Sequence, residues 1–409
     1  MSFGIALSGL NAAQTDLNVT ANNIANSSTN GFKQSRSEFA ELFAVSPQGV
    51  SRNQFGNGVK VAAVAQQFTQ GNTTSTNNSL DMAISGQGFF VLSDGGASAY
   101  TRAGAFQVND DGYVVNSQSQ RLQVYPPSTT GNFNTSTLSD LRVVTSESAP
   151  AATTEVETIF NLPANSAQPT VATFDPANPN SYNNATSMTV YDSLGAAHTA
   201  SLYFVKTATP NEWTAQMYVD GNILGTPQTL AYNSTGSLVT PATGVIAFPD
   251  YDAAAGLSTG AAPISMDFNF SQTTQYGGAF GVNSVTQDGF TTGRLIGIDV
   301  DSTGVVQARF TNGRSNSLGQ VAIANFANPQ GLQQLGNTNW AETNASGQSL
   351  RGQAGNSGFG LVQSGALEAS NVDITAQLVN MITAQRNFQA NAQMIQTADQ
   401  VTQTIINIR

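Results

Sequence analysis

Apolar residues recur at every seventh position near the N-terminus, a spacing typical of helices that pack side by side. Leu10, Leu17 and Ile24 keep this spacing, with alanines on the same face. Residues 10–25 contain neither Gly nor Pro, so no strong helix breaker interrupts the pattern. The pattern predicts an N-terminal helix with one apolar stripe, which at about three heptads is marginal on its own.

A second, longer helix is predicted at the C-terminus, because residues 371–409 also lack Gly and Pro. Residues 370–373 (Ser-Asn-Val-Asp) predict a capping box at its start. Its apolar stripe consists of Ile374, Leu378, Met381, Phe388 and Ile395. An amphipathic helix that covers a β domain would show the same stripe. The low charge and matching periods of both ends favour packing of the helices on each other and on further copies.

Between the two ends the period changes to two, which is typical of strands, and Gly-rich turns interrupt it. Residues 188–191 and 202–205 flank a turn at 192–195 and predict a hairpin. Residues 150–185 hold several prolines and small polar residues, and we interpret them as a crossing between domains. The fold class that follows is α+β, with helical ends that bracket a mainly β middle.

The chain has 409 residues, which is long enough for two or three domains. Its composition excludes several classes of binding partner. Its net charge is −11 without any basic cluster, so nucleic acid and anionic membrane surfaces are not expected partners. No apolar run reaches membrane-spanning length, and the first basic residue is Lys33, so neither membrane insertion nor a cleaved secretory signal is expected. Cys is absent, which excludes disulfides and thiolate chemistry.

Residues that carry catalytic or metal chemistry are sparse. The single histidine, His198, lies on the second arm of the predicted hairpin, where a strand-borne polar residue is the simpler interpretation. Residues 299–304 resemble the start of a calcium loop, but Phe310 stands where the loop needs Glu, so we interpret them as a hairpin turn. Paired carboxylates at 155/157 and 250/252 are the only support for a carbohydrate-active enzyme. No enzyme, cofactor or metal is predicted.

Three blocks of the chain carry distinctive patterns: residues 21–33, 84–106 and 365–391. Together they resemble the signature of the bacterial flagellar rod and hook family. The signature residues are Asn22, Asn23, Asn26, Gly31, Phe32, Gly88, Phe89, Asn371, Gln385 and Arg386. Two inner blocks, 188–206 and 318–327, are similar to the hook members in particular. Residues 376–377 (Ala-Gln) depart from the pattern where relatives often carry an acidic residue, which puts any salt bridge there in doubt.

The resemblance implies a specific domain organisation. Residues 1–30 and 366–409 would pair as a coiled-coil-like inner domain around a central channel, and residues 31–70 would connect it to the rest. Two mainly β domains would be nested between the helices, a middle one formed by 71–146 with 287–365 and an outer one formed by 147–286. The stripe residues Leu10, Leu17, Ile24, Ile374, Leu378, Met381, Phe388 and Ile395 would carry assembly.

The resemblance also implies a structural subunit of a self-assembling extracellular tube, the curved hook that transmits torque to the filament. The expected partners are further copies, the distal rod, the hook cap, the hook–filament junction proteins and the flagellar type III export gate. Phe39 and Phe43 resemble a short export-gate motif, although amphipathic packing explains the same spacing. The alternatives are another axial subunit, of distal rod or junction type, or a secreted β-rich carbohydrate-active protein.

Overall fold

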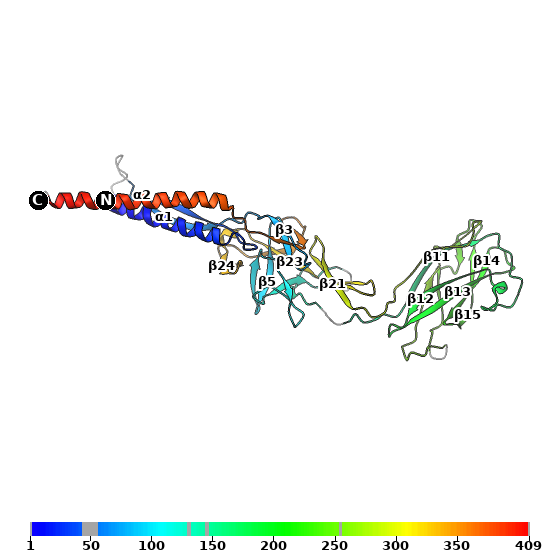
Figure 1. Cartoon of the computed structure of the whole chain (residues 1–409). Coiled ribbons are helices and arrows are strands. Elements are labelled where there is room, and N and C mark those ends of the chain that lie inside the picture. The colour runs from blue at the N-terminus through cyan, green and yellow to red at the C-terminus, as the bar shows by residue number, and fades with distance from the viewer. Residues whose placement is uncertain (1, 43–55, 129–131, 144–146, 253–255, 408–409) are drawn as a thin grey trace. The chain divides into compact units, whose positions relative to one another are not determined.

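The structure of the chain, a computed structural model, describes residues 2–42, 56–128, 132–143, 147–252 and 256–407 (Figure 1). It divides into two compact units. Unit 1 comprises Met1–Thr145, Gly297–Arg309 and Ser315–Arg409, and unit 2 comprises Ser146–Ile296 and Phe310–Arg314. No helix within the described residues has the length and apolar character needed to cross a membrane.

Two long antiparallel helices, α1 (Ser2–Ala25) and α2 (Ile374–Asn407), lie side by side in unit 1 (Figure 1). Contacts between Gly9 and Asn391 near one end and between Asn23 and Gln377 near the other fix the pairing. A Cβ at Gly9 would lie 2.6 Å from the Asn391 side chain, so a larger residue there would displace that side chain. The predicted pairing of the two chain ends is confirmed.

The residues buried between and beneath the helices are small or polar rather than large and apolar. They are Ala6, Ala12, Ala13, Thr20, Asn23, Gln377 and Ala384. Small side chains permit close approach of the two backbones, but they remove little apolar surface from water. The pairing of α1 with α2 alone therefore leaves much of the apolar surface of both helices uncovered.

Helix α2 begins at Ile374, three residues later than expected, and its cap is Asp373 rather than a capping box opened by Ser370. The Asp373 Oδ1 accepts hydrogen bonds from the N–H groups of Thr375 (2.8 Å) and Ala376 (3.2 Å). Asp373 thereby satisfies two donors that the first helical turn leaves free.

The body of unit 1 is β structure. Strands β1 (Ser35–Glu41) and β2 (Val59–Gln66) form an antiparallel hairpin that packs against α1. A 12-stranded sheet contains β5 (Phe89–Asp94), β6 (Ala97–Thr101), β7 (Gln107–Val108), β8 (Val114–Val115), β9 (Arg121–Tyr125), β10 (Ser139–Asp140), β21 (Leu295–Val300), β22 (Val305–Phe310), β23 (Ser315–Asn325), β24 (Gln333–Gly336), β25 (Asn339–Ala341) and β26 (Leu350–Gln353). Two further pairs join distant segments: β3 (Thr73–Ser75) with β28 (Ala366–Glu368), and β4 (Met82–Ser85) with β27 (Leu361–Ser364).

An aromatic cluster forms the core on one side of this sheet. The rings of Phe68, Phe89 and Trp340 meet edge to face with centroids 5.6 Å apart, and Phe326 packs on Phe89 and Tyr100. Edge-to-face pairs are the favoured arrangement of aromatic rings and add to the gain from burial. Residues from both halves of the chain thus build one core.

Unit 2 is a β-sandwich. One five-stranded sheet consists of β12 (Asn184–Tyr191), β13 (Ala197–Lys206), β14 (Glu212–Val219), β15 (Asn222–Tyr232) and β16 (Leu238–Thr240) in chain order. The other contains β11 (Glu155–Pro163), β17 (Val245–Ala247), β18 (Asp267–Asn269), β19 (Thr274–Tyr276) and β20 (Gly281–Gln287). Alternate residues of each sheet enter a shared core that includes Phe160, Phe204 and Trp213, all fully buried.

The expectation that residues 150–185 merely cross between domains is wrong for β11. Every second residue of β11 is buried, including Val156, Phe160 and Leu162. The strand pairs with β18, β19 and β20. The Pro-rich composition of the following residues obscured this alternation. The α+β class, with paired terminal helices and a mainly β middle, is confirmed.

Candidate assembly surface

Large apolar side chains remain exposed along both terminal helices. On α1, Phe3 and Leu7 are 48% and 43% exposed, and on α2, Val379 is 59% exposed. We call the full set the exposed helix surface: Phe3, Ile5, Leu7, Ile374, Leu378, Val379, Ile382, Met394, Val401 and Ile406. Exposed apolar surface on this scale is typical of a protein–protein contact.

The apolar stripe predicted from the sequence divides into two groups. Ile374 and Leu378 are about half exposed and belong to the exposed helix surface. The other six, Leu10, Leu17, Ile24, Met381, Phe388 and Ile395, are partly buried. Partial burial means that the six flank the contact between α1 and α2 without being covered by it, so further contacts remain open to them. Their role in assembly stays a prediction.

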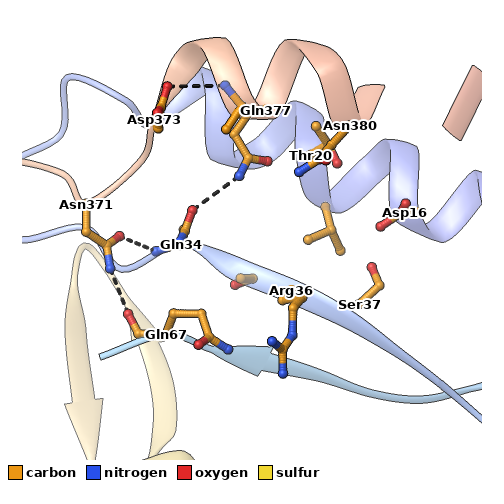
Figure 2. Close-up of a pocket in the computed structure, with 13 residues that line it drawn as sticks. Asp16, Thr20, Gln34, Arg36, Ser37, Gln67, Asn371, Asp373, Gln377 and Asn380 are labelled. Atoms are coloured by element: carbon orange, nitrogen blue, oxygen red, sulfur yellow. Dashed lines mark hydrogen bonds between the residues drawn. The ribbon is translucent and has the colours of Figure 1, made fainter. Parts of the chain in front are cut away.

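A network of amide side chains holds the base of the helix pair to the β1–β2 hairpin (Figure 2). The Asn23 side chain accepts a hydrogen bond from Ser35 N–H (2.9 Å) and donates to Ser35 C=O (2.8 Å) and to Gln377 (3.3 Å). Gln377 in turn donates to the Gln34 side chain (3.2 Å). The Asn371 Oδ1 accepts from Gln34 N–H (2.8 Å). The Asn371 Nδ2 donates to the backbone carbonyls of Gln67 (2.8 Å) and Thr69 (3.2 Å), just after β2.

These contacts explain two of the signature residues. Asn23 and Asn371 each act as donor and acceptor at once, which an amide can do and a carboxylate cannot. Gln377, within the 376–377 pair singled out in the sequence, extends the same network as a neutral group.

Three charged side chains form a buried cluster next to this network, and no sequence motif predicted it. The Glu368 carboxylate, fully buried, accepts from Lys33 Nζ (2.6 Å), Arg102 Nη1 (3.2 Å) and Gly71 N–H (2.8 Å). Burial lowers the pKa of Lys33, and the Glu368 carboxylate opposes that effect. The cluster ties the segment after α1 to the segment before α2, and removing the Glu368 carboxylate would leave two cations buried and uncompensated.

Two signature glycines are required by their surroundings. Gly31 has φ = +70°, and a Cβ there would lie 2.5 Å from the Ala103 backbone nitrogen. Gly88 has φ = +123°, and a Cβ there would lie 2.3 Å from the Ile323 side chain. Both positions exclude other residues by backbone conformation and by space. Phe89 beside Gly88 belongs to the aromatic core, and Arg102 packs over its ring.

The remaining signature residues have more local surroundings. Asn26 donates to the Asn22 side chain (2.6 Å) at the end of α1, and Phe32 C=O accepts from Asn371 N–H (3.4 Å). Gln385 and Arg386 differ from the rest, because both are exposed on α2.

Half of the predicted export-gate motif can be located. Phe39 lies on β1 and is 43% exposed, whereas Phe43 lies outside the described residues. The motif stays a prediction.

The residues that the sequence offered for catalysis or calcium binding, His198 and the 299–304 turn, make hydrogen bonds that hold strands and turns in place. His198 lies on β13 between two carboxylates, with Nδ1 2.6 Å from Asp220 and Nε2 3.4 Å from Asp192. Burial raises the pKa of both aspartates, but the hydrogen bonds that they accept, including those from His198, outweigh it and lower the pKa overall. Asp301 Oδ1 accepts from the N–H groups of Thr303 and Val305 (both 2.9 Å), which confirms the predicted hairpin turn.

Four family models match the chain. They are described as flagella basal body rod protein (residues 3–33), flagellar hook protein FlgE/F/G D1 domain (83–173), flagellar basal body protein FlaE D2 domain (161–290) and flagellar basal body rod FlgEFG protein C-terminal (363–408). The terminal matches fall on the helix pair and the inner matches on the β structure. Fold and matches together define a flagellar axial protein of the rod and hook class.

Full-length relatives identify the type within that class. The chain is 41% identical to the flagellar hook protein FlgE of Escherichia coli and 39% identical to that of Salmonella typhimurium, covering 100% of both chains in each case. It is 32% identical to that of Borreliella burgdorferi over 98% of each chain. The chain belongs to the flagellar hook protein family and is a structural subunit of the hook.

One solved structure supports the fold. The crystal structure of Helicobacter pylori flagellar hook protein FlgE2 matches with a TM-score of 0.53 at 14% identity, covering 72% of this chain and 100% of that one.

Proposed function

We propose that the chain polymerises through its terminal helices, so that the helix pairs of many copies form the wall of the hook tube around a central channel. The observation that carries this proposal is the exposed helix surface, because the contact between α1 and α2 leaves it uncovered. Assembly of this kind covers the apolar side chains that each helix pair leaves exposed to water.

The magnitudes favour contact with several neighbours. Burying the exposed half of one Leu, Ile or Val contributes about 1 kcal/mol. The ten side chains of the exposed helix surface together contribute roughly 10 kcal/mol when all are buried. This gain is comparable to the cost of about 4–15 kcal/mol for the translational and rotational freedom that one subunit loses on binding. A pairwise contact would bury only part of this surface. A growing tube, in which each new subunit meets several others, is therefore favoured over a dimer.

The proposal assigns a task to each segment. Residues 1–30 with 366–409 form the inner domain, 31–70 connect it, 71–146 with 287–365 form the middle β domain, and 147–286 form the outer one. Stiff helices keep the tube continuous while it transmits torque. The β domains, with surfaces rich in uncharged polar groups, slide past their neighbours, because their hydrogen bonds exchange with water at small net cost.

The proposed partners follow from this location. The distal rod lies at one end of the tube, and the hook cap and the hook–filament junction proteins lie at the other. The subunit reaches this extracellular position through the flagellar type III export gate, with Phe39 and Phe43 as the candidate gate motif. Its role is structural rather than enzymatic.

Substitution within the exposed helix surface tests the proposal. We expect Leu378→Asp to abolish tube formation by the purified full chain, as followed by sedimentation and electron microscopy, because a carboxylate cannot be buried there without a partner. Leu17→Asp, at a partly buried residue of the predicted stripe, should do the same. The matched control is Leu350→Asp, which changes a residue of the β body that is 64% exposed. Tubes from Leu378→Asp, or loss of tubes only in Leu350→Asp, would contradict the proposal.

A further inference from the structure

The helix pair carries very few charges, and their positions are informative. Within α1 and α2 the charged residues are Asp16, Arg386 and Asp399. Among the described residues, neither Asp16 nor Arg386 forms an ion pair or a side-chain hydrogen bond with any other. Each is therefore an unpaired charge on a surface that we propose to be covered by other copies.

Asp16 faces a pocket at the base of the helix pair (Figure 2). The pocket has a volume of about 330 Å³ and lies between α1, the start of α2 and the β1 strand. Its other acidic and basic residues are already engaged: Asp373 caps α2, and Arg36 pairs with Glu38 (2.7 Å). The Asp16 carboxylate, which is partly buried, thus has no hydrogen-bond or ion-pair partner within the described part of the chain, in a pocket whose remaining polar lining consists of amides and hydroxyls.

Arg386 is the single cation of the two helices and points away from this pocket within its own chain. It follows the buried Ala384 by two residues, so at about 100° per residue it lies about 200° around α2 from the contact with α1. Ile382 and Val379 precede Arg386 by four and seven residues and so lie on the same face of α2. They are 50% and 59% exposed. Arginine is enriched in protein interfaces, and here its guanidinium is flanked on one side by two exposed apolar side chains.

We propose that Arg386 of one copy enters this pocket of a second copy and pairs with Asp16. Charge complementarity supports this occupant. Among the described residues Arg386 has no carboxylate partner, and Arg36, the one cation that lines the pocket, pairs with Glu38 rather than with Asp16. The apolar residues around Arg386 would then seal the contact from water, where an ion pair is stronger. This inference rests on the proposed function. The exposed helix surface makes contact between copies favourable, and the Asp16–Arg386 pair would fix how one copy is oriented on the next.

Charge reversal tests the pair. We expect Asp16→Arg and Arg386→Asp each to raise the critical concentration for tube formation by the full chain about tenfold or more, since unpaired charges in an interface are costly. The double variant Asp16→Arg/Arg386→Asp should return to within about threefold of the unmodified chain. The matched control is Asp399→Arg, which reverses the carboxylate of α2 instead of that of α1 and should not be rescued by Arg386→Asp.

The outcomes separate this pair from the general assembly mechanism. A double variant no better than the single variants, or rescue with Asp399→Arg instead, would overturn the pairing even if Leu378→Asp still blocks assembly. Tubes from Leu378→Asp would overturn the proposed function itself.

Crosslinking gives an independent readout that does not depend on the effect of charge reversal on folding. Because the chain has no cysteine, Asp16→Cys and Arg386→Cys chains can be mixed, co-assembled and treated with a short bismaleimide. Heterodimers that form only in tubes support the pair, and their absence in intact tubes overturns it.

Discussion

The core of unit 2 and the contact between the terminal helices represent two ways of using apolar residues. In unit 2, Phe160, Phe204 and Trp213 are removed completely from water by the two sheets of one chain. In the helix pair, the fully covered positions are alanines and polar residues, while Leu378, Val379 and Ile382 remain about half exposed. One region completes its core within the chain, whereas the other presents its larger side chains outward.

This difference separates folding from assembly. A sandwich that buries its own aromatic residues can fold in a dilute subunit, because the gain from burial is available at once. A helix pair with small residues at its contact gains little until neighbours cover it. We therefore expect the dilute subunit to have stable β domains, and its terminal helices to become stably ordered only where the subunit is incorporated.

The largest expected effect concerns the sandwich core. We expect Trp213→Ala to lower the free energy of unfolding of unit 2 by about 3–5 kcal/mol, because it empties a fully buried site. Urea unfolding followed by circular dichroism measures this. Leu378→Ala, on the exposed helix surface, is the control and should change the stability of the dilute subunit by less than about 0.5 kcal/mol. Equal effects would remove the distinction between the two regions.

The buried charge cluster comes next. Glu368→Gln leaves Lys33 and Arg102 buried without a compensating charge, and we expect the free energy of unfolding of unit 1 to fall by about 3 kcal/mol. The control, Glu38→Gln, disrupts the solvent-exposed pair with Arg36 and should cost less than about 1 kcal/mol. A cost for Glu368→Gln as small as that of the control would show that the cluster does not tie the two chain segments together.

Hydrogen exchange sharpens the comparison for the free subunit. We expect amides of α1 and α2 to exchange at least about a hundredfold faster than amides of β13 and β14 in a dilute solution, a difference of ~2.7 kcal/mol in opening free energy. Incorporation into tubes should abolish the difference. Strong protection at Leu17 or Phe388 in the dilute subunit would mean that the helix pair is stable without neighbours.

A smaller effect is expected from pH within unit 2. The pKa values of Asp192 and Asp220 are lowered in the folded state, so their contribution to stability is present above the unfolded carboxyl pKa of about 3.9 and is lost as pH falls through the folded values. Asp220→Asn should therefore flatten the decline of the melting temperature of unit 2 between about pH 5 and pH 3. Asp267→Asn, at an exposed position, should leave that decline unchanged.

The seven-residue spacing was sufficient to predict both terminal helices, because a regular apolar period depends only on local geometry. It did not predict which residues the helices would cover. The stripe of large residues drew attention to Leu10 and Phe388, whereas the chain covers Ala13 and Ala384 between them. Which face of a helix is buried depends on partners, and a single sequence does not show how far apart two helices lie.

The candidate site was predicted in part. Gly31 and Asn371 were identified by resemblance, and the structure adds the reasons, a left-handed backbone and a bridging amide. The Lys33–Glu368–Arg102 cluster was missed, because its members are far apart in the chain and each resembles an ordinary surface charge. In a chain with only 10% charged residues, charges next to signature motifs were the available signal.

The way the chain enters and leaves unit 2 has a consequence for engineering and evolution. The backbone of Ser148 pairs with that of Gly293, and Ala151 pairs with Phe290, as neighbours in an antiparallel bridge. The two ends of this inserted segment are therefore about 5 Å apart, the distance that a tight turn closes. A module with adjacent ends can be exchanged for another of different size, or for a short turn, without moving the ends of the chain that hosts it. Length variation in such subunits is accordingly expected to accumulate here, while the terminal helices keep their register.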